Sequence, residues 1–271
     1  VAKIPMLHAE TKTSTIMSYG YEPNISKWSP FHGAIYAVVE SLAKVVATGG
    51  DYSKIRLTFQ EYFEKLGDDP EKWGKPFSAL IGAFYAQMKM GVAAIGGKDS
   101  MSGTFENLTV PPTLVSFAVD VENVDNIISP EFKKAGNTVV YLPAKRDKYD
   151  VPDFEYLKNM FNLVTKLIRD GICVSAHTVK TGGIAEAVSK MTFGNDIGFK
   201  LNDGIKIEDL FKPEYGSFVL ELSDAKIIDF MGIDVVYLGE TTDEPVISIG
   251  ETDIDVKVLA ELWQMPLEKV F

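Results

Sequence analysis

The residues best suited to chemistry lie together in one short segment, Ala94-Ile-Gly-Gly-Lys-Asp-Ser-Met-Ser-Gly-Thr-Phe105. Two consecutive glycines let the backbone approach a phosphate closely, and the N–H groups that follow can form an anion-binding nest. Asp99 offers a hard oxygen ligand for Mg²⁺. The candidate phosphate contacts are Gly96, Gly97, Lys98, Ser100 and Ser102. The glycine-to-lysine spacing is not that of a Walker A motif, and the same composition also makes a good surface turn.

A second group of polar residues recurs at four-residue spacing: His32, Tyr36, Glu40 and Lys44. This spacing places them on one face of a helix. Glu40 is suited to join Asp99 around a metal ion that bridges phosphates. The alternative is an ordinary ion pair between Glu40 and Lys44 on a solvated face, worth a few tenths of a kcal/mol.

The second half of the chain offers weaker signals. His177 lies after a predicted strand and just before Thr181-Gly182-Gly183, a junction that can hold an anion or simply connect two elements. Cys173 lies among apolar neighbours, where thiols are usually inert. The residues show no nucleophile elbow and no Cys/His metal spacing, so none is assigned a catalytic role.

The elements that position these residues alternate irregularly between strands and helices, which predicts an α+β fold. In the first half we expect strands at 13–19, 92–95 and 113–121, the last with Val115, Phe117, Val119 and Val121 on its buried face. Helices are predicted from Pro30 to Gly49 and from Pro76 to Met90. The second helix carries Phe77, Leu80, Ile81, Phe84 and Met88 on one face. Residues 51–73 are predicted to form an irregular connection between the two helices, with one short helix in it.

A boundary is expected within 126–136, which divides the chain into domains 1–128 and 129–271. Beyond it we predict strands at 138–142 and 172–176, with a helix over 151–171 between them. Another helix follows Gly183 and runs to about Thr192. Four strands are then expected near Phe199 and at 217–222, 235–239 and 246–249. Residues 254–271 are predicted to form a strand or a helix.

Charge and composition exclude several classes of function. Asp and Glu number 38 against 27 Lys and Arg, a formal net charge of −11, which disfavours nucleic-acid or anionic-membrane partners. No apolar run approaches the roughly 18–20 residues that span a bilayer. The single cysteine indicates a reducing compartment, so we expect a cytoplasmic protein. The start, Val1-Ala-Lys-Ile-Pro, is interpreted as a position inside a longer protein.

Four segments of the chain, in the same order, resemble phosphoribosylformylglycinamidine synthases. They are SPFHGAIYAVVESLAKVVATGGDYSKIRLTFQEYF, then AIGGKDSMSGTF with VPPTLVSFAV, then SAHTVKTGGIAEAVSKMTFGNDIGF, and finally KPEYGSFVLEL. That family is an ATP-dependent ligase and glutamine amidotransferase of purine biosynthesis. Each of its two synthetase units resembles aminoimidazole ribonucleotide synthetase, with an ATP-binding A domain followed by a B domain. By this resemblance, the chain is the second unit.

The resemblance implies ATP or ADP with Mg²⁺ as ligands. Gly97, Lys98, Asp99 and Ser100 match the nucleotide and metal segment, and Glu40 matches a helix carboxylate that binds Mg²⁺. Three positions depart from the family's pattern. Lys44 stands where the family has an asparagine; its ammonium is a candidate nucleotide contact through phosphate but cannot ligate Mg²⁺, which leaves the number of metal ions open. Thr178 and Thr181 stand where the family has acidic residues, which implies a vestigial ligand site in the second domain.

The resemblance also sets the expected partners. These are the first synthetase unit and the glutaminase domain of the same polypeptide, whose absence would leave the 271 residues alone inactive. One alternative is a structural half that holds ADP without hydrolysing it. Another is a free-standing relative of aminoimidazole ribonucleotide synthetase, which the second-unit pattern disfavours. Because A domains of this superfamily pair sheet to sheet, we expect a homodimer through residues 1–125.

Overall fold

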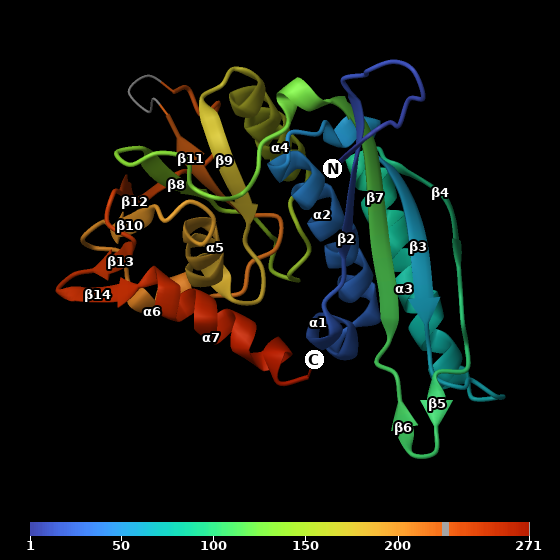
Figure 1. Ribbon diagram of the computed structural model, residues 1–271. Coiled ribbons are helices and arrows are strands. Elements are labelled where there is room, and N and C mark those ends of the chain that lie inside the picture. Colours follow the sequence, from blue (N-terminus) through green and yellow to red (C-terminus); the bar gives the residue numbers. More distant parts are fainter. Residues whose placement is uncertain (224–227, 271) are drawn as a thin grey trace. The chain divides into compact units, whose positions relative to one another are not determined.

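The computed structural model describes residues 1–223 and 228–270 (Figure 1). It mixes helices with mostly antiparallel sheets, which confirms the predicted α+β class. The chain forms two compact units. Unit 1 contains Val1–Ile127 and Ala144–Asn162, and unit 2 contains Ile128–Pro143 and Leu163–Phe271. The division into a nucleotide-binding domain 1–128 and a second domain 129–271 stays a prediction.

Unit 1 is built on a five-stranded sheet of order β1-β2-β7-β3-β4. Its strands are β1 (Ala2–Lys3), β2 (Thr13–Gly20), β7 (Thr113–Asn123), β3 (Arg56–Tyr62) and β4 (Ala93–Lys98). A small hairpin of β5 (Thr104–Phe105) and β6 (Leu108–Thr109) interrupts the connection from β4 to β7. Strands β2 and β3 each pair antiparallel with β7, whereas β3 and β4 pair in parallel. Strands β2, β3 and β4 therefore run in the same direction, and their C-terminal ends lie at the same end of the sheet.

Helices α1 (Pro23–Trp28), α2 (Pro30–Ala47) and α3 (Pro70–Met90) also belong to unit 1, and α2 packs on β2 and β7 (Figure 1). Helix α2 begins as predicted: Ser29 caps its N-terminus and Pro30 occupies the first turn. It is buried on nearly all sides. Helix α3 begins six residues earlier than predicted, because Asp69 caps it and Pro70 starts it, so Pro76 lies inside the helix.

Small residues bring α2 and α3 together. The buried side of α3 consists mainly of Ala79, Gly82, Ala83 and Ala86. A methyl group on Gly82 would lie 2.1 Å from the carbonyl oxygen of Phe31, so only glycine permits this crossing. The large apolar residues that share the predicted face are exposed instead, among them Phe77 and Phe84 at 66% and 62%. Helix α3 therefore packs through its small residues and leaves its large ones outside.

The predicted buried face of β7 is wrong by one residue. Leu114, Ser116, Ala118, Asp120 and Glu122 face the helices, whereas Val121 is 57% exposed on the other face. The register places Met17 opposite Val119 and Tyr19 opposite Phe117 on that outer face. Small and acidic residues fill the narrow space beneath α2. As a result, the apolar residues of β7 and β2 form an outer apolar face of the sheet, defined by Met17, Tyr19, Phe117, Val119 and Val121.

Strand β3 lies within residues 51–73, which were predicted to form an irregular connection. The expected short helix there is the 3₁₀ turn Tyr52–Lys54, and β3 follows it directly. Alternation along β3 places Leu57, Phe59 and Glu61 on the helix-facing side. A glutamate in that series hides the apolar pattern of a buried strand, which explains why the strand was missed.

Unit 2 contains a seven-stranded sheet of order β14-β13-β10-β12-β8-β11-β9. Its strands are β8 (Thr138–Leu142), β9 (Cys173–Thr178), β10 (Gly198–Leu201), β11 (Phe218–Leu222), β12 (Val236–Thr242), β13 (Val246–Ile249) and β14 (Thr252–Asp255). The helices are α5 (Gly183–Thr192), α6 (Ile207–Leu210) and α7 (Val256–Glu268), and α4 (Phe154–Arg169) leads into this unit from residues assigned to unit 1. The expected strands are all present. Of the segment predicted as a strand or a helix, 254–271, the first two residues end β14 and helix α7 follows, and residue 271 lies outside the described residues.

A buried carboxylate organises the start of unit 2. Glu221 on β11 is fully buried, and its carboxylate accepts hydrogen bonds from the backbone N–H groups of Lys133 and Lys134 at 2.9 Å and 3.2 Å. The side-chain amide of Asn137 donates a third bond at 2.7 Å. Glu221 therefore ties the segment before β8 to strand β11, which lies between β8 and β9.

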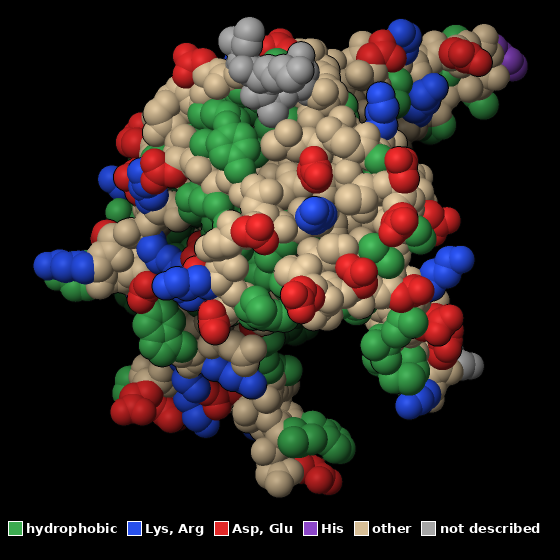
Figure 2. Space-filling model, turned by 90° about the vertical axis from the view of Figure 1, so that its left-hand side faces the viewer, with side chains coloured by type: hydrophobic (Ala, Val, Ile, Leu, Met, Phe, Trp, Pro, Cys, Tyr) green, Lys and Arg blue, Asp and Glu red, His purple; other side chains and the backbone are tan. Residues whose placement is uncertain are grey.

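The surface is acidic, as composition predicts. On the face shown in Figure 2, Asp and Glu side chains are interspersed with Lys and Arg over the coloured, described residues. Within the described part of the chain, no helix is both long and apolar enough to cross a membrane.

Candidate functional site

The glycine-rich segment lies at an edge of the unit 1 sheet. Strand β4 pairs only with β3, so its other side is open. Gly97 pairs with Phe59, and a methyl group on Gly97 would lie 2.5 Å from the carbonyl oxygen of Phe59. By contrast, a methyl group on Gly96 would meet nothing within 4 Å. Gly97 is therefore required by the close approach of β3, whereas Gly96 leaves open space beside the backbone.

Backbone hydrogen bonds fix the loop that follows β4. Phe63 donates its N–H to the carbonyl of Ser100 at 2.9 Å and accepts from the N–H of Gly103 at 2.8 Å. The Lys98 ammonium donates to the Ser100 hydroxyl at 2.6 Å and to the carbonyl of Asp99 at 2.9 Å. Lys98, Asp99 and Ser102 are exposed. The structure thus brings the predicted phosphate contacts together in one ordered, solvent-facing loop.

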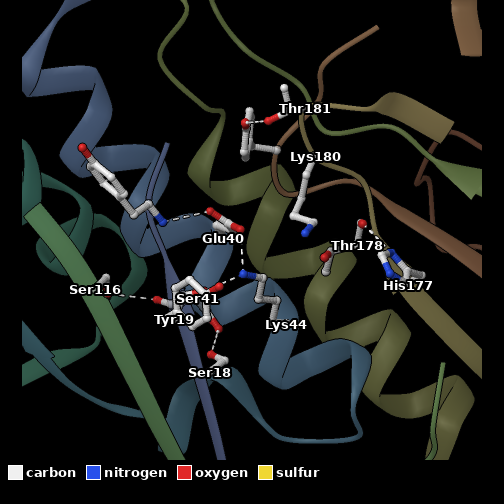
Figure 3. A network of polar contacts seen from close by, with 12 residues as sticks. Ser18, Tyr19, Glu40, Ser41, Lys44, Ser116, His177, Thr178, Lys180 and Thr181 are labelled. Carbon is white, nitrogen blue, oxygen red and sulfur yellow. Dashed lines mark hydrogen bonds and ion pairs between the residues drawn. The ribbon is translucent and has the colours of Figure 1, made fainter. Parts of the chain in front are cut away.

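Glu40 and Lys44 form a second polar group on α2 (Figure 3). One oxygen of Glu40 lies 2.7 Å from the Lys44 ammonium, and the other accepts the backbone N–H of Tyr21 at 3.0 Å. Lys44 also donates to the carbonyl of Tyr19 at 2.7 Å, and its ammonium lies 4.4 Å from the centre of the Tyr19 ring. This is the ion pair of the sequence alternative, although it is buried at Glu40 rather than solvated.

The residues of α2 do not fit a metal site as they stand. Both Glu40 oxygens are already engaged, so a divalent cation there must displace the Lys44 ammonium. Glu40 lies beside Tyr21, directly after β2, whereas Asp99 follows β4, and the strands β7 and β3 separate β2 from β4. Strands β2 and β4 are therefore three strand spacings apart, which is roughly 14 Å. The structure does not bring Glu40 and Asp99 into contact, and their shared metal stays a prediction.

Glu61 is the residue that the sequence analysis missed. It is 4% exposed at the end of β3, and its oxygen Oε1 has no hydrogen-bond partner. Burial raises the pKa of Glu61 to about 7, and the negative charge of Asp99 adds to this increase. The one available signal was an acidic residue at an inward position of a strand. Within the described ranges, no cluster of three or more Asp, Glu, His or Cys residues is arranged to hold a metal.

The candidate anion site of unit 2 is occupied by the chain itself. The N–H of Gly182, before α5, donates to the carboxylate of Glu186 at 3.0 Å. Lys190 and Lys180 also contact that carboxylate. This arrangement satisfies the helix start without an external anion.

His177 and Thr181 also have internal partners (Figure 3). A ring nitrogen of His177 lies 2.7 Å from the carbonyl of Thr178, and the Thr181 hydroxyl lies 2.7 Å from that of Tyr215. Burial lowers the pKa of His177 to about 4, so its imidazole is neutral near pH 7. Cys173 is fully buried, and burial raises the pKa of its thiol, which leaves it without thiolate character.

Comparison with solved structures defines the class of fold. PurL of Thermotoga maritima complexed with AMPPCP superposes with a TM-score of 0.74 at 16% identity, over 92% of this chain and 44% of that protein. Thiamine monophosphate kinase of Aquifex aeolicus gives 0.62 at 11% identity, over 90% and 89%. The chain therefore has the aminoimidazole ribonucleotide synthetase-like fold, as predicted.

Sequence comparison narrows the relationship. A probable chloroplastic/mitochondrial phosphoribosylformylglycinamidine synthase of Arabidopsis thaliana is 29% identical over 229 residues, which is 69% of this chain and 16% of that protein. The synthase subunit PurL of Limosilactobacillus reuteri is 23% identical over 264 residues, or 87% and 35%. No family model matches. The chain is thus similar to part of the phosphoribosylformylglycinamidine synthases, which confirms the predicted resemblance, and it spans well under half the length of these relatives.

Proposed function

We propose that this chain is the nucleotide-binding second unit of a phosphoribosylformylglycinamidine synthase. The observation that carries the proposal is the ordered loop from Gly96 to Ser102, placed at the open edge of a sheet in this fold. The resemblance to a PurL solved with an ATP analogue supports a nucleotide as the ligand. The backbone of Gly96 and Gly97, the Lys98 ammonium and the hydroxyls of the loop would contact its phosphates.

The reaction belongs to the longer synthase in this proposal. ATP would phosphorylate the amide oxygen of formylglycinamide ribonucleotide, and ammonia from glutamine would then displace phosphate to give the amidine. Such a transfer depends on positioning and charge stabilisation. We place the catalytic groups in the first synthetase unit and the glutaminase cysteine in the glutaminase domain, since Cys173 is buried, and we assign no turnover to the 271 residues alone. Its partners would be the first synthetase unit and the glutaminase domain, in the cytoplasm.

Mg²⁺ would accompany the nucleotide and neutralise phosphate charge. Asp99 fits this role because its carboxylate is exposed on the phosphate-binding loop. Glu40 fits it only once Lys44 has moved. In this chain Lys44 supplies a fixed positive charge beside Glu40, where the family's asparagine supplies none.

A second candidate function is a structural unit that retains ADP. The Glu40–Lys44 ion pair and the self-capped start of α5 favour it, because both positions are already neutralised within the chain. Nucleotide exchange separates the two functions. Tightly held ADP that exchanges slowly and is never hydrolysed supports the structural unit, whereas rapid exchange coupled to turnover in the complete synthase supports catalysis.

The proposal predicts that Asp99→Asn weakens binding of Mg²⁺ with a non-hydrolysable ATP analogue by about tenfold, or about 1.4 kcal/mol. Removal of the carboxylate leaves the charge of the cation uncompensated. Thr181→Ala is the comparison, and it should change the affinity little because the Thr181 hydroxyl bonds Tyr215. Isothermal titration of the purified chain measures both. An unchanged affinity in Asp99→Asn would remove that residue from the site.

We also expect the chain to form a homodimer through the outer apolar face of its unit 1 sheet. Met17 is 65% exposed there and Tyr19 is 59% exposed, a contiguous surface that soluble monomers rarely leave open. A two-fold contact would cover it symmetrically. Light scattering at micromolar concentration should give twice the chain mass, and Met17→Lys with Val121→Lys should give the monomer. A wild-type chain that is monomeric without aggregating would contradict this expectation.

A further inference from the structure

The inward face of β3 ends in a buried glutamate, Glu61, one oxygen of which has no partner in the protein. Glu61 continues the series of Leu57 and Phe59 on the face that packs against the helices, and it pairs across the sheet with the buried Leu114. Its oxygen Oε1 accepts no hydrogen bond. An unsatisfied buried carboxyl group costs free energy, and buried polar atoms in folded proteins almost always have a partner. A ligand that reaches Glu61 would supply the missing partner.

The neighbour of Glu61 along the sheet is Asp99. Strands β3 and β4 run parallel, with Phe59 opposite Gly97 and Gln60 opposite Lys98. The pairing continues past β4, because the carbonyl of Ser100 accepts the N–H of Phe63. Between these two contacts, Glu61 and Asp99 lie opposite each other. Their backbones are one strand spacing apart, about 4.8 Å, and alternation places their side chains on the same face. The negative charge of Asp99 contributes to the raised pKa of Glu61, as expected for neighbours.

We propose that Glu61 and Asp99 together bind one divalent cation, Mg²⁺ or Mn²⁺, at the ends of β3 and β4. Mg²⁺ in proteins is commonly held by one or two carboxylates, with water and phosphate oxygens completing its six ligands. Two adjacent carboxylates of which one is buried repel each other, and a cation between them removes that repulsion. The site deepens the proposed function, on which it rests for the phosphate oxygens that would complete the shell.

This pair suits a cation better than the acid on α2 does. Glu40 already has an ammonium partner and a backbone donor, whereas Oε1 of Glu61 has neither. Glu64, three residues further along, is also satisfied, since Lys75 and Lys72 contact its two oxygens. Among these three glutamates of unit 1, Glu61 alone has an unpartnered buried oxygen. The competing occupant of the pair is a proton, which would make Glu61 a neutral acid.

The test is a Mn²⁺ titration of the whole chain without nucleotide, followed by electron paramagnetic resonance at roughly pH 8, above the raised pKa of Glu61. We expect one Mn²⁺ per chain, displaced by Mg²⁺. Glu61→Gln and Asp99→Asn should each weaken binding by at least about tenfold. Glu64→Gln removes the same charge nearby and should change the affinity by less than about twofold.

Thermal melting with and without Mn²⁺ distinguishes a variant that has lost the cation site from a variant that does not fold. Mn²⁺ should raise the melting temperature of the wild type and of Glu64→Gln, but not that of Asp99→Asn, whose substitution lies on an exposed loop. A wild type that binds no Mn²⁺ overturns the proposal and shows that a proton neutralises the pair. Binding that survives Glu61→Gln but is lost in Glu40→Gln overturns it in favour of α2. Mn²⁺ binding without any nucleotide binding would instead retain the cation site and refute the proposed function.

Discussion

Replacement of Glu221 by alanine is expected to destabilise unit 2 by about 3–5 kcal/mol, enough to unfold many domains. The carboxylate accepts from Lys133 N–H, Lys134 N–H and the Asn137 amide, and it is fully buried. Alanine would leave these donors without an acceptor, and each buried donor without a partner costs about 1–3 kcal/mol. The free energy of unfolding from urea denaturation, followed by circular dichroism, measures the loss.

Two further variants sharpen this experiment. Glu221→Gln keeps the side-chain volume and one carbonyl acceptor, so it should cost less than alanine. Glu251→Ala is the control, because Glu251 is an exposed acid of the same unit, and it should change the free energy of unfolding by less than about 0.5 kcal/mol. If Glu221→Ala were as stable as the control, water rather than the carboxylate would have to satisfy these donors.

The sequence pattern was sufficient to predict those elements whose capping residues and apolar spacing agree with the way they pack. Helix α2 has a serine cap, a proline in its first turn and a continuous apolar face, and it forms as predicted. The phase of β7 was not predictable from hydrophobicity, because this strand buries small and acidic residues beneath α2 and leaves its valines outside. An exposed apolar face has the same alternation as a buried one, and sequence alone does not distinguish the two.

The candidate site was predictable only in part for a related reason. The loop from Gly96 to Ser102 is contiguous, so its composition reveals it directly. Glu61 comes near this loop only through the parallel pairing of β3 with β4, in which Gln60 lies opposite Lys98, and no local spacing encodes that pairing. The same glutamate disrupted the apolar alternation of β3, and so both the strand and the acid were missed together.

The Glu40–Lys44 pair shows how the residue four positions after a helix carboxylate decides what that carboxylate can bind. At four-residue spacing a glutamate and an asparagine both present oxygen ligands on one helix face. With Lys44 the same spacing produces an internal ion pair at 2.7 Å, further fixed by the carbonyl of Tyr19. The charge of Glu40 is therefore neutralised within the chain.

Gly97→Ala is expected to lower the affinity for a nucleotide by at least about tenfold and the free energy of unfolding by about 1–3 kcal/mol. Its new methyl group would lie 2.5 Å from the carbonyl oxygen of Phe59, a backbone atom that cannot rotate away. Strands β3 and β4 must then separate, which displaces the loop that β3 holds through Phe63. Urea denaturation and titration with a non-hydrolysable ATP analogue measure the two effects.

Gly96→Ala separates the packing of this loop from its contact with phosphate. No atom lies within 4 Å of the added methyl group, so the free energy of unfolding should stay within about 0.5 kcal/mol of the wild type. The methyl group would nevertheless occupy the open space through which a phosphate approaches the backbone, and we expect the affinity to fall several-fold. An unchanged affinity would mean that the phosphate does not approach Gly96. Equal stability of the two alanine variants would mean that Gly97 is not held against Phe59, and the placement of β4 on β3 would then be wrong.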